Sequence, residues 1–533
     1  MEKRNLCKNG RKLLLTSALI VVMVVGRPSK NDAVLSTNGR KPPKAARPNI
    51  LLIMCDQFCA SLLPCYGGTA DAPHIERLAA RGMVYTSAYC SMPVSSPSRA
   101  SLITGLYPHR HGIAQNVFRV DYPTLGGPDT EEGIDGRDIT TEGLLYDNGY
   151  KVYHAGKWHL SGEDLACYPV MYREHQEYGT EMKETFERAI SGRARSEWVD
   201  WYGWKLPVTM TPAYRAAVET AGMDDAVEFF RKMGRLDLPL EDTYDYRTAS
   251  KCVQVIQEST QPFMATCSFN LPHDPNVVPS PYYEQVDMSR IKADVTLPCD
   301  EYYHNEYYRM ITQKAGNDFL TEFLRIYHAS IKLIDDQVGR LLEALEERGI
   351  ADNTLIIFTA DHGDYAGGHG MVWKTTSSFY EEVARVPLII CAPDANPGRY
   401  EKPVELVDVM PTILEYSGVS VPLHIDGASL LPVLAGGNVP KDVAISERLN
   451  WSPDHKRHPH TRDEREHFMV RYEQYKYVFH REGNRMKQLL FDLQNDPHEY
   501  TNLFGTKGYE DTGAAMHERL RTRLAETGYE LVL

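Results

Sequence analysis

Apolar and polar positions along the chain follow two periods, which predicts alternating strands and helices. Nearly continuous apolar runs at residues 49–54 and 354–359 are typical of strands buried on both faces of a parallel sheet. Residues 319–348 instead place their apolar side chains on one stripe at helical spacing, and Gly349 ends that pattern. The alternation predicts an α/β fold, with a mostly parallel sheet flanked by helices.

Shorter segments extend this pattern. Further strands are expected at 83–89, 150–155, 263–269 and 387–391, and further helices at 73–81, 98–104, 140–148, 246–258 and 406–416. Pro97 suits the first turn of a helix, the serines before it can cap that helix, and Gly105 ends it.

Two regions depart from the pattern. Residues 161–245 are aromatic and charged and show no clear strands, so we expect an insertion over one end of the sheet. Residues 427–533 predict a smaller C-terminal α+β subdomain with an antiparallel sheet and a final helix at 513–527.

The N-terminus is basic and is followed by an apolar run at 13–25, which is the pattern of a secretory signal. We therefore expect a signal peptide at 1–26, a linker at 27–46, a large domain at 47–426 and the subdomain at 427–533. This predicts export to the periplasm or cell envelope, with no stable membrane span after processing. An uncleaved membrane anchor is the alternative.

Composition narrows the class of partner. The 533 residues are 42% hydrophobic and 24% charged, which is ordinary for a globular protein. The formal net charge of −14 disfavours a broad nucleic-acid or anionic-membrane surface, so no nucleic-acid partner is expected. A small cationic pocket is compatible with this balance.

Chemically active side chains follow five of the predicted strands. These are Asp56 and Gln57, then Ser95 and Arg99, then Lys157 and His159, then His273, then Asp361, His362 and Asp364. Ligands bind beyond the carboxyl ends of strands in open α/β sheets, so the recurrence predicts an enzyme. Each residue alone also has an ordinary interpretation, such as a cap, a turn or an ion pair.

The residue types indicate a class of chemistry. Carboxylate and amide oxygens at Asp56, Gln57 and Asp361 suit Ca²⁺ or Mg²⁺, and His362 admits Mn²⁺. The cations Arg99, Lys157 and Lys374 favour an anionic substrate such as a sulfate or phosphate ester. His159 and His273 are candidate general acids or bases.

These residues resemble the motifs of type I sulfatases. The signature at 95–99, Ser-Ser-Pro-Ser-Arg, is followed by Leu-Ile-Thr-Gly at 102–105. Further matches are at 47–53, 156–159, 272–273, 361–363, 368–370 with Lys374, 426–427, 491–493 and 496–497. The resemblance covers nearly all of the expected mature chain. It implies an alkaline-phosphatase-like catalytic domain at 47–426.

The resemblance also implies residue roles. Ser95 would be converted to formylglycine, whose hydrate attacks sulfur, and Arg99 would steady it. Asp56, Gln57, Ser95, Asp361 and His362 would bind a Ca²⁺, with Mg²⁺ or Mn²⁺ as alternatives. Lys157 and Lys374 would bind sulfate oxygens. His159 would accept the proton that expels sulfate, and His273 would protonate the leaving alcohol.

Three departures from the family pattern refine the expectation. Serine instead of cysteine at position 95 implies a serine-type bacterial member, matured by an oxygen-independent sulfatase-maturating enzyme. Gln57 replaces a second aspartate, which removes a negative charge, and His362 stands where many members have asparagine. The expected substrate is a sulfated carbohydrate: a glycosaminoglycan, mucin or algal glycan. The alternatives are a phosphonate monoesterase or phosphodiesterase, and an unmatured glycan-binding protein.

Overall fold

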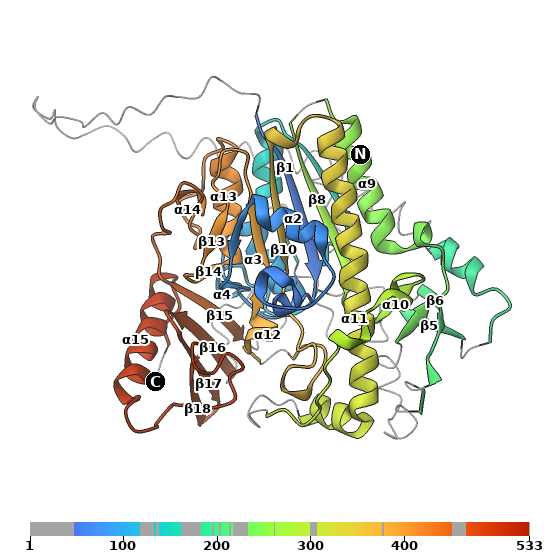
Figure 1. Cartoon of the computed structure of the whole chain (residues 1–533). Helices are drawn as coiled ribbons and strands as arrows, with labels where there is room; N and C mark the ends of the chain where they lie inside the picture. The colour runs from blue at the N-terminus through green and yellow to red at the C-terminus, as the bar shows by residue number, and fades with distance from the viewer. Residues whose placement is uncertain are drawn as a thin grey trace, which may run out of the picture.

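A seven-stranded sheet forms the core of the protein (Figure 1). This computed structural model describes residues 47–531, except 118–132, 135–137, 161–182, 195–196, 202–203, 213–214, 217–232, 261, 299–305, 376–377 and 450–464. In spatial order the strands are β13 (Gly398–Tyr400), β2 (Met83–Tyr85), β12 (Leu388–Cys391), β10 (Thr354–Ala360), β1 (Asn49–Asp56), β8 (Phe263–Pro272) and β4 (Lys151–Gly156).

The sheet is mostly parallel, as the apolar runs predict. Strand β1 pairs in parallel with β10 and β8, and β4 pairs in parallel with β8. Strand β12 is antiparallel to both of its neighbours, β10 and β2. All eight residues of β1 are buried, because helices cover the sheet on both sides, and this explains its unbroken apolar run.

Two groups of helices flank the sheet. One group packs together as α2 (Pro73–Arg81), α9 (Tyr244–Glu258) and α11 (Glu306–Glu347), with α11 running the length of the molecule in Figure 1. The other comprises α3 (Ser95–Thr104), α5 (Thr141–Asp147) and α13 (Val409–Tyr416). Helix α11 contains the predicted helix at 319–348 but begins earlier, and it is interrupted by Gly316 at φ 78°.

Short helical turns connect these elements. They are α4 (Pro108–His111), α10 (Tyr282–Gln285), α12 (Glu381–Ala384), α14 (Leu431–Leu434), η1 (Ala60–Leu62), η2 (Pro64–Tyr66), η6 (Leu240–Asp242), η7 (Met288–Arg290), η9 (Ala351–Asn353), η10 (Gly368–Gly370) and η11 (Leu406–Asp408).

The predicted strand at 83–89 is wrong as a single element. It divides into β2 and β3 (Ala88–Tyr89), and β3 belongs to a second sheet with β11 (Arg385–Val386) and β14 (Val404–Glu405). The sequence pattern does not show where β2 ends and β3 begins. All residues of both short strands are buried, so the exposure of their side chains does not change from one strand to the other.

The start of helix α3 also differs from the sequence prediction. The helix begins at Ser95, and its N-cap is Val94, which makes no side-chain capping bond. The expected serine cap is therefore wrong, because the serines lie inside the helix. Pro97 does lie in the first turn, and Gly105 ends the helix in the left-handed region at φ 67°.

The insertion contains strands that the sequence did not predict. Strands β5 (Trp198–Trp201), β6 (Trp204–Thr209) and β7 (Gly234–Leu236) form a sheet with β9 (Val277–Pro279). Strand β9 lies outside the insertion, so the sheet depends on pairing that local periodicity does not report. Residues 161–182 and 217–232 of the insertion lie outside the described residues.

The C-terminal region has the antiparallel sheet and final helix that the sequence predicts. Strands β15 (Val443–Leu449), β16 (Arg465–Tyr472), β17 (Tyr475–Glu482) and β18 (Arg485–Asp492) follow one another in the sheet, and α15 (Glu510–Glu526) packs on it (Figure 1). Tyr107 and Val407 from the larger part join its hydrophobic core. The boundary at 426/427 stays a prediction.

None of the helices in the described ranges has the length and apolar character needed to cross a membrane. The predicted signal peptide at 1–26 and linker at 27–46 lie outside the described residues.

A buried histidine joins the subdomain to the larger part of the molecule. His109 Nδ1 lies 2.7 Å from Glu447 Oε2, and its Nε2 lies 3.1 Å from the carbonyl oxygen of Thr527. A carbonyl oxygen only accepts, and the buried Glu447 carboxylate also accepts from the His109 backbone N–H. Both ring nitrogens therefore donate, which defines an imidazolium. Burial lowers the pKa of His109, but Glu447 and the hydrogen bonds outweigh this and raise it above 6.5.

Replacing this histidine will make stability depend less on pH. A pKa raised in the folded state contributes stability that is complete below about pH 6.5 and is lost as pH rises through the raised value. We expect His109→Gln to cost about 1–3 kcal/mol at about pH 6 and less at about pH 9. Urea unfolding at both pH values measures this difference. A cost that grows with pH would contradict the imidazolium assignment.

Candidate active site

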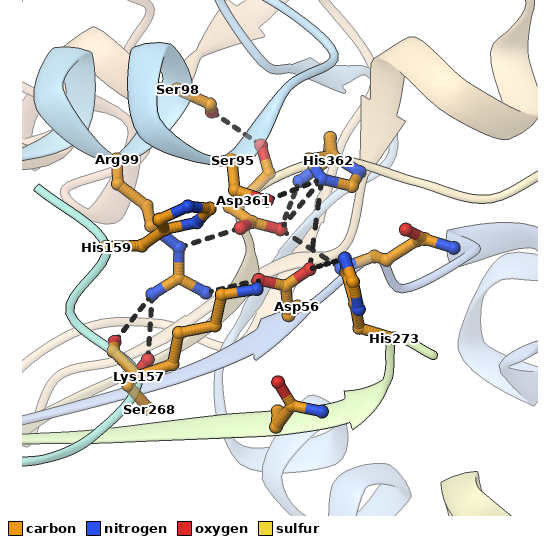
Figure 2. A network of polar contacts seen from close by, with 12 residues as sticks. Asp56, Ser95, Ser98, Arg99, Lys157, His159, Ser268, His273, Asp361 and His362 are labelled. Atoms are coloured by element: carbon orange, nitrogen blue, oxygen red, sulfur yellow. Dashed lines mark hydrogen bonds and ion pairs between the residues drawn. The ribbon is translucent and has the colours of Figure 1, made fainter. Parts of the chain in front are cut away.

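Four neighbouring strands end at one edge of the sheet and place polar side chains close together (Figure 2). Asp56 is the last residue of β1, Lys157 follows β4, and Asp361 follows β10. Lys157 Nζ lies 2.6 Å from Asp56 Oδ2. His273, just after β8, has its Nε2 3.8 Å from Asp56 Oδ1. This is the edge at which open α/β sheets bind ligands.

Arg99 ties the site together from helix α3. Its Nη2 donates to Asp56 Oδ2 at 3.0 Å, and its Nε donates to Asp361 Oδ2 at 2.8 Å. Nη1 donates to the Lys157 carbonyl at 2.8 Å and to Ser268 Oγ at 2.9 Å. The side chain is only 1% exposed, so its positive charge is compensated by these buried carboxylates.

Positively charged neighbours keep the carboxyl group of Asp56 ionised. Burial alone would raise the pKa of Asp56, but Lys157, His273 and Arg99 together hold it well below its usual range. Its Oδ1 is buried and has no hydrogen-bond partner. A buried carboxylate oxygen without a donor has lone pairs available for a cation.

Ser95 is the first residue of helix α3, and it is completely buried. Its Oγ lies 3.2 Å from His362 Nε2. Neighbouring serines secure this end of the helix: Ser98 Oγ donates to the Asp361 carbonyl, and Ser96 Oγ donates to the His159 carbonyl. Ser95 thus faces the group at the ends of β10 and β1 from the start of helix α3, which follows β3 of the second sheet (Figure 2).

His362 presents a lone pair to the site. Its Nδ1 lies 2.8 Å from the Gly363 carbonyl, which only accepts, so Nδ1 carries the proton. Burial, then the positive charge of Lys374, lowers the pKa of His362 to about 4, so the ring is neutral. The unprotonated Nε2 faces Asp56 Oδ1 at 3.9 Å and Asp361 Oδ1 at 3.7 Å.

The residues present fit a divalent cation. Ligand atoms of Asp56, Asp361 and His362 all lie within 4.8 Å of one another, and all three residues are buried. Two carboxylate oxygens and a neutral imidazole nitrogen are suitable ligands, and the unpartnered Asp56 Oδ1 is one of them. Carboxylate oxygens favour a hard ion such as Ca²⁺ or Mg²⁺, although the geometry does not select between ions.

Gln57 and Lys374 lie beside this group. Lys374 Nζ is 3.0 Å from Gln57 Oε1 and 2.8 Å from His362 Nε2. Burial lowers the pKa of the Lys374 ammonium, against the raising effects of Asp56 and Asp361. Lys157 and Lys374 therefore provide cationic groups next to the ligand atoms, where an anionic substrate would also lie.

Both candidate acid–base histidines lie near these charges, where His273 is buried and His159 is partly buried (Figure 2). Burial and then Lys157 lower the pKa of His159 well below 6.5, and the same two causes lower the pKa of His273. His273 Nδ1 lies 2.8 Å from the Asp274 carbonyl, so Nδ1 donates and Nε2 faces Asp56. Both rings are neutral at pH 7, with His273 oriented by its own loop.

Three residues in this region have a left-handed backbone conformation, which is uncommon for residues other than glycine. Gln57 has φ 60°, His159 has φ 58°, and Trp373, just before Lys374, has φ 64°. A left-handed conformation costs a residue with a Cβ about 1–2 kcal/mol. The surrounding structure compensates for this cost, and such residues are frequent at functional sites.

Two polar residues of the site had no predicted role: Ser268 was not among the candidates, and Asp364 was expected at the end of a strand but was given no function. Ser268 binds Arg99 from within β8, and its hydroxyl gave no distinct signal because Thr266 and Asn270 are polar positions of the same strand. Asp364 binds Gln57, and its position two residues after His362 was visible in the sequence. The roles proposed for the other site residues stay predictions.

A second group of metal-type side chains, His74, Asp335 and Asp336, lies elsewhere among the described residues. The ammonium of Lys332 lies 2.8 Å from Asp336 Oδ1 and 3.7 Å from Asp335 Oδ2. The positive charge of Lys332 therefore already compensates the two carboxyl groups of this second group.

The α/β fold and the charged edge of its sheet suit an enzyme that acts on an anionic ester. Residues 48–419 match the family model described as Sulfatase, and residues 367–526 match the C-terminal domain of N-sulphoglucosamine sulphohydrolase. The chain therefore belongs to the sulfatase family and is a hydrolase.

Individual relatives support this assignment. A choline-sulfatase of Rhizobium meliloti is 29% identical, covering 86% of this chain and 82% of the relative. An N-acetylglucosamine-6-O-sulfatase of Bacteroides thetaiotaomicron is 26% identical, covering 97% and 91%. The solved phosphonate monoester hydrolase of Agrobacterium radiobacter superposes with a TM-score of 0.66 at 23% identity, covering 90% and 96%, which shows the shared fold.

Proposed function

We propose that the protein hydrolyses sulfate esters of a carbohydrate, using a formylglycine made from Ser95 together with a bound Ca²⁺. The observation that carries this proposal is the position of Ser95 Oγ, 3.2 Å from His362 Nε2 at the start of a buried helix. The same small volume holds three buried metal-type ligands, and Lys157 and Lys374 lie beside them.

Two groups supply the central chemistry. A formylglycine at position 95 supplies, when hydrated, a nucleophile stronger than an unassisted serine hydroxyl. A divalent cation held by Asp56, Gln57, Asp361 and His362 supplies Lewis-acid stabilisation of the charge on the transferring group. Lys157 and Lys374 bind the sulfate oxygens and orient the ester, and Arg99 pairs with Asp56 and Asp361 and holds both in place.

The two histidines move protons. His159 is neutral and so acts as the base that accepts the proton during sulfate release. His273 acts as the acid toward the leaving alcohol. An anionic substrate next to Lys157 offsets the positive charge that lowers the pKa of His273, and so favours protonation at Nε2 once the ester is bound.

The proposed substrate class, the proposed maturation of Ser95 and the proposed export each rest on a separate observation. The N-acetylglucosamine-6-O-sulfatase spans nearly the whole chain, which favours a sulfated sugar as substrate. Serine at position 95 favours an oxygen-independent sulfatase-maturating enzyme as partner. The basic and apolar pattern at 1–26 favours export to the periplasm or cell envelope.

The test combines mass analysis with a substrate comparison. Protein produced with and without an oxygen-independent maturating enzyme is digested, and the mass of the peptide containing Ser95 is measured. Loss of two hydrogens is expected only after maturation. The matured enzyme is then compared on sulfate, phosphate and phosphonate esters, followed by sulfated mono- and disaccharides. Faster phosphorus-ester turnover would contradict the sulfatase proposal, and an unmodified, inactive Ser95 in the native host would favour a glycan-binding protein.

Removing Lys374 will weaken catalysis without unfolding the protein. We expect Lys374→Ala to lower kcat/KM by about 10²–10³-fold, because one positioned cation at the transferring group is lost. Steady-state kinetics measure this, and Lys332→Ala is the matched control, since Lys332 pairs with Asp336 away from the site. An unchanged kcat/KM in Lys374→Ala would remove this lysine from the substrate site.

A further inference from the structure

The side chain of Asp364 is buried in the site, but the proposed mechanism assigns it no role. It lies on the loop after β10 and is completely buried. Its Oδ1 accepts from the Ala366 backbone N–H at 2.7 Å. Its Oδ2 accepts from the side-chain amide of Gln57 at 2.6 Å. The second contact links Asp364 to a predicted metal ligand.

The Gln57 amide lies between two groups with opposite hydrogen-bonding capacity. Lys374 Nζ, which only donates, is 3.0 Å from Oε1. Asp364 Oδ2, as a carboxylate oxygen, accepts from Nε2. A reversed amide would place two donors together at Lys374 and two acceptors together at Asp364. The arrangement therefore permits one orientation of the amide.

The rest of Gln57 is fixed as well. Its backbone N–H donates to Asp361 Oδ1 at 3.0 Å, and its carbonyl accepts from the Tyr327 hydroxyl at 2.6 Å. Lys374 Nζ also lies 2.8 Å from His362 Nε2. The same ammonium group therefore contacts both Gln57 Oε1 and His362 Nε2, which places these two atoms near each other. With the backbone held, reversal of the amide is the main freedom that remains, and Asp364 removes it.

We propose that Asp364 is a positioning residue that holds Gln57 Oε1 toward the metal ligands Asp361 and His362. The inference rests on the proposed function, because it requires a divalent cation at this site. Burial raises the pKa of Asp364 to about 7, against the hydrogen bonds from Gln57 and Ala366, so Asp364 acts on Gln57 through its hydrogen bond and not through a charge placed on the ion. The hydrogen bond polarises the amide and makes Oε1 a better ligand, as outer hydrogen bonds do for metal ligands generally. This allows an amide to serve where a carboxylate is usual in the family.

The test is a charge exchange between positions 57 and 364. Calcium is titrated by calorimetry into the full chain and into Asp364→Asn, Gln57→Glu and the double variant. We expect Asp364→Asn to weaken Ca²⁺ binding about 10–100-fold, because asparagine can either donate or accept and no longer fixes the amide. Gln57→Glu alone opposes two carboxylates. The double variant restores a carboxylate–amide pair, and we expect its Kd to return to within about 3-fold of the original.

The controls separate this inference from the proposed function. Asp492→Asn changes another buried aspartate, at the end of β18 in the C-terminal sheet, and should leave the Kd unchanged. Circular dichroism in chelator checks that each variant is folded. Unchanged Ca²⁺ affinity in Asp364→Asn would overturn the inference, and so would a loss that the double variant does not recover. If the unaltered protein binds no Ca²⁺, the metal part of the proposed function fails instead.

Discussion

Ser95→Ala is expected to reduce turnover by on the order of 10⁴-fold or more while leaving the fold intact, because the variant cannot form the nucleophile. The cost in stability should be about 1 kcal/mol or less, since the one hydrogen bond of Ser95 Oγ to the described part of the chain is the one to His362 Nε2. Turnover of a sulfate ester by matured enzyme and thermal unfolding measure the two effects.

A second serine on the same helix is the matched control for this prediction. Ser101 is equally buried, and its Oγ contacts His111 away from the site. Ser101→Ala should keep its activity. Ser95→Cys, which retains a residue that the family converts, should regain activity after maturation. Activity in Ser95→Ala close to that of the unaltered enzyme would contradict the proposed nucleophile.

Arg99→Met is expected to have the largest effect on stability. The substitution keeps much of the side-chain volume but leaves the buried Asp56 and Asp361 without their shared partner. Breaking a buried ion pair in this way costs about 3–5 kcal/mol. Urea unfolding in the presence of a chelator measures the change in the free energy of unfolding, and activity should be lost together with it.

Calcium binding provides a further test of the stability loss expected in Arg99→Met. A divalent cation bound between Asp56 and Asp361 supplies positive charge, so saturating Ca²⁺ should recover part of the lost stability. Arg99→Lys retains the charge but cannot make the same set of bonds, and should lie between the unaltered protein and Arg99→Met. Equal stability of all three in chelator would show that the Arg99 network contributes little.

The sequence predicts the centre of the main sheet well, because β1, β8 and β10 are long and buried on both faces, whereas the short edge strand β13 was not predicted. β1 and β10 are unbroken apolar runs, and their side chains report burial directly. The same patterns do not report pairing between short segments. The division between β2 and β3, and the sheet of β5, β6, β7 and β9, depend on contacts between residues distant in the chain.

The site illustrates the same limit. Residues at the ends of long strands, such as Asp56 in β1 and Asp361 just after β10, could be placed together from the sequence, because parallel strands end at one edge. Ser95 could be assigned a role through its motif and the resemblance, but its position on helix α3, which follows β3 of the second sheet, was not predicted. Contacts that depend on side-chain orientation, such as Gln57 with Asp364, have no signature in the order of residues.

The left-handed backbone at Gln57, His159 and Trp373 has a consequence for how this enzyme can evolve. Glycine at any of these positions would relieve the conformational cost, so selection for heat resistance alone favours it. Glycine at position 57 or 159 would also delete a predicted ligand or base. A laboratory lineage selected only for thermal tolerance should therefore drift toward a robust but inactive protein, and screening for turnover in every round is needed to prevent this.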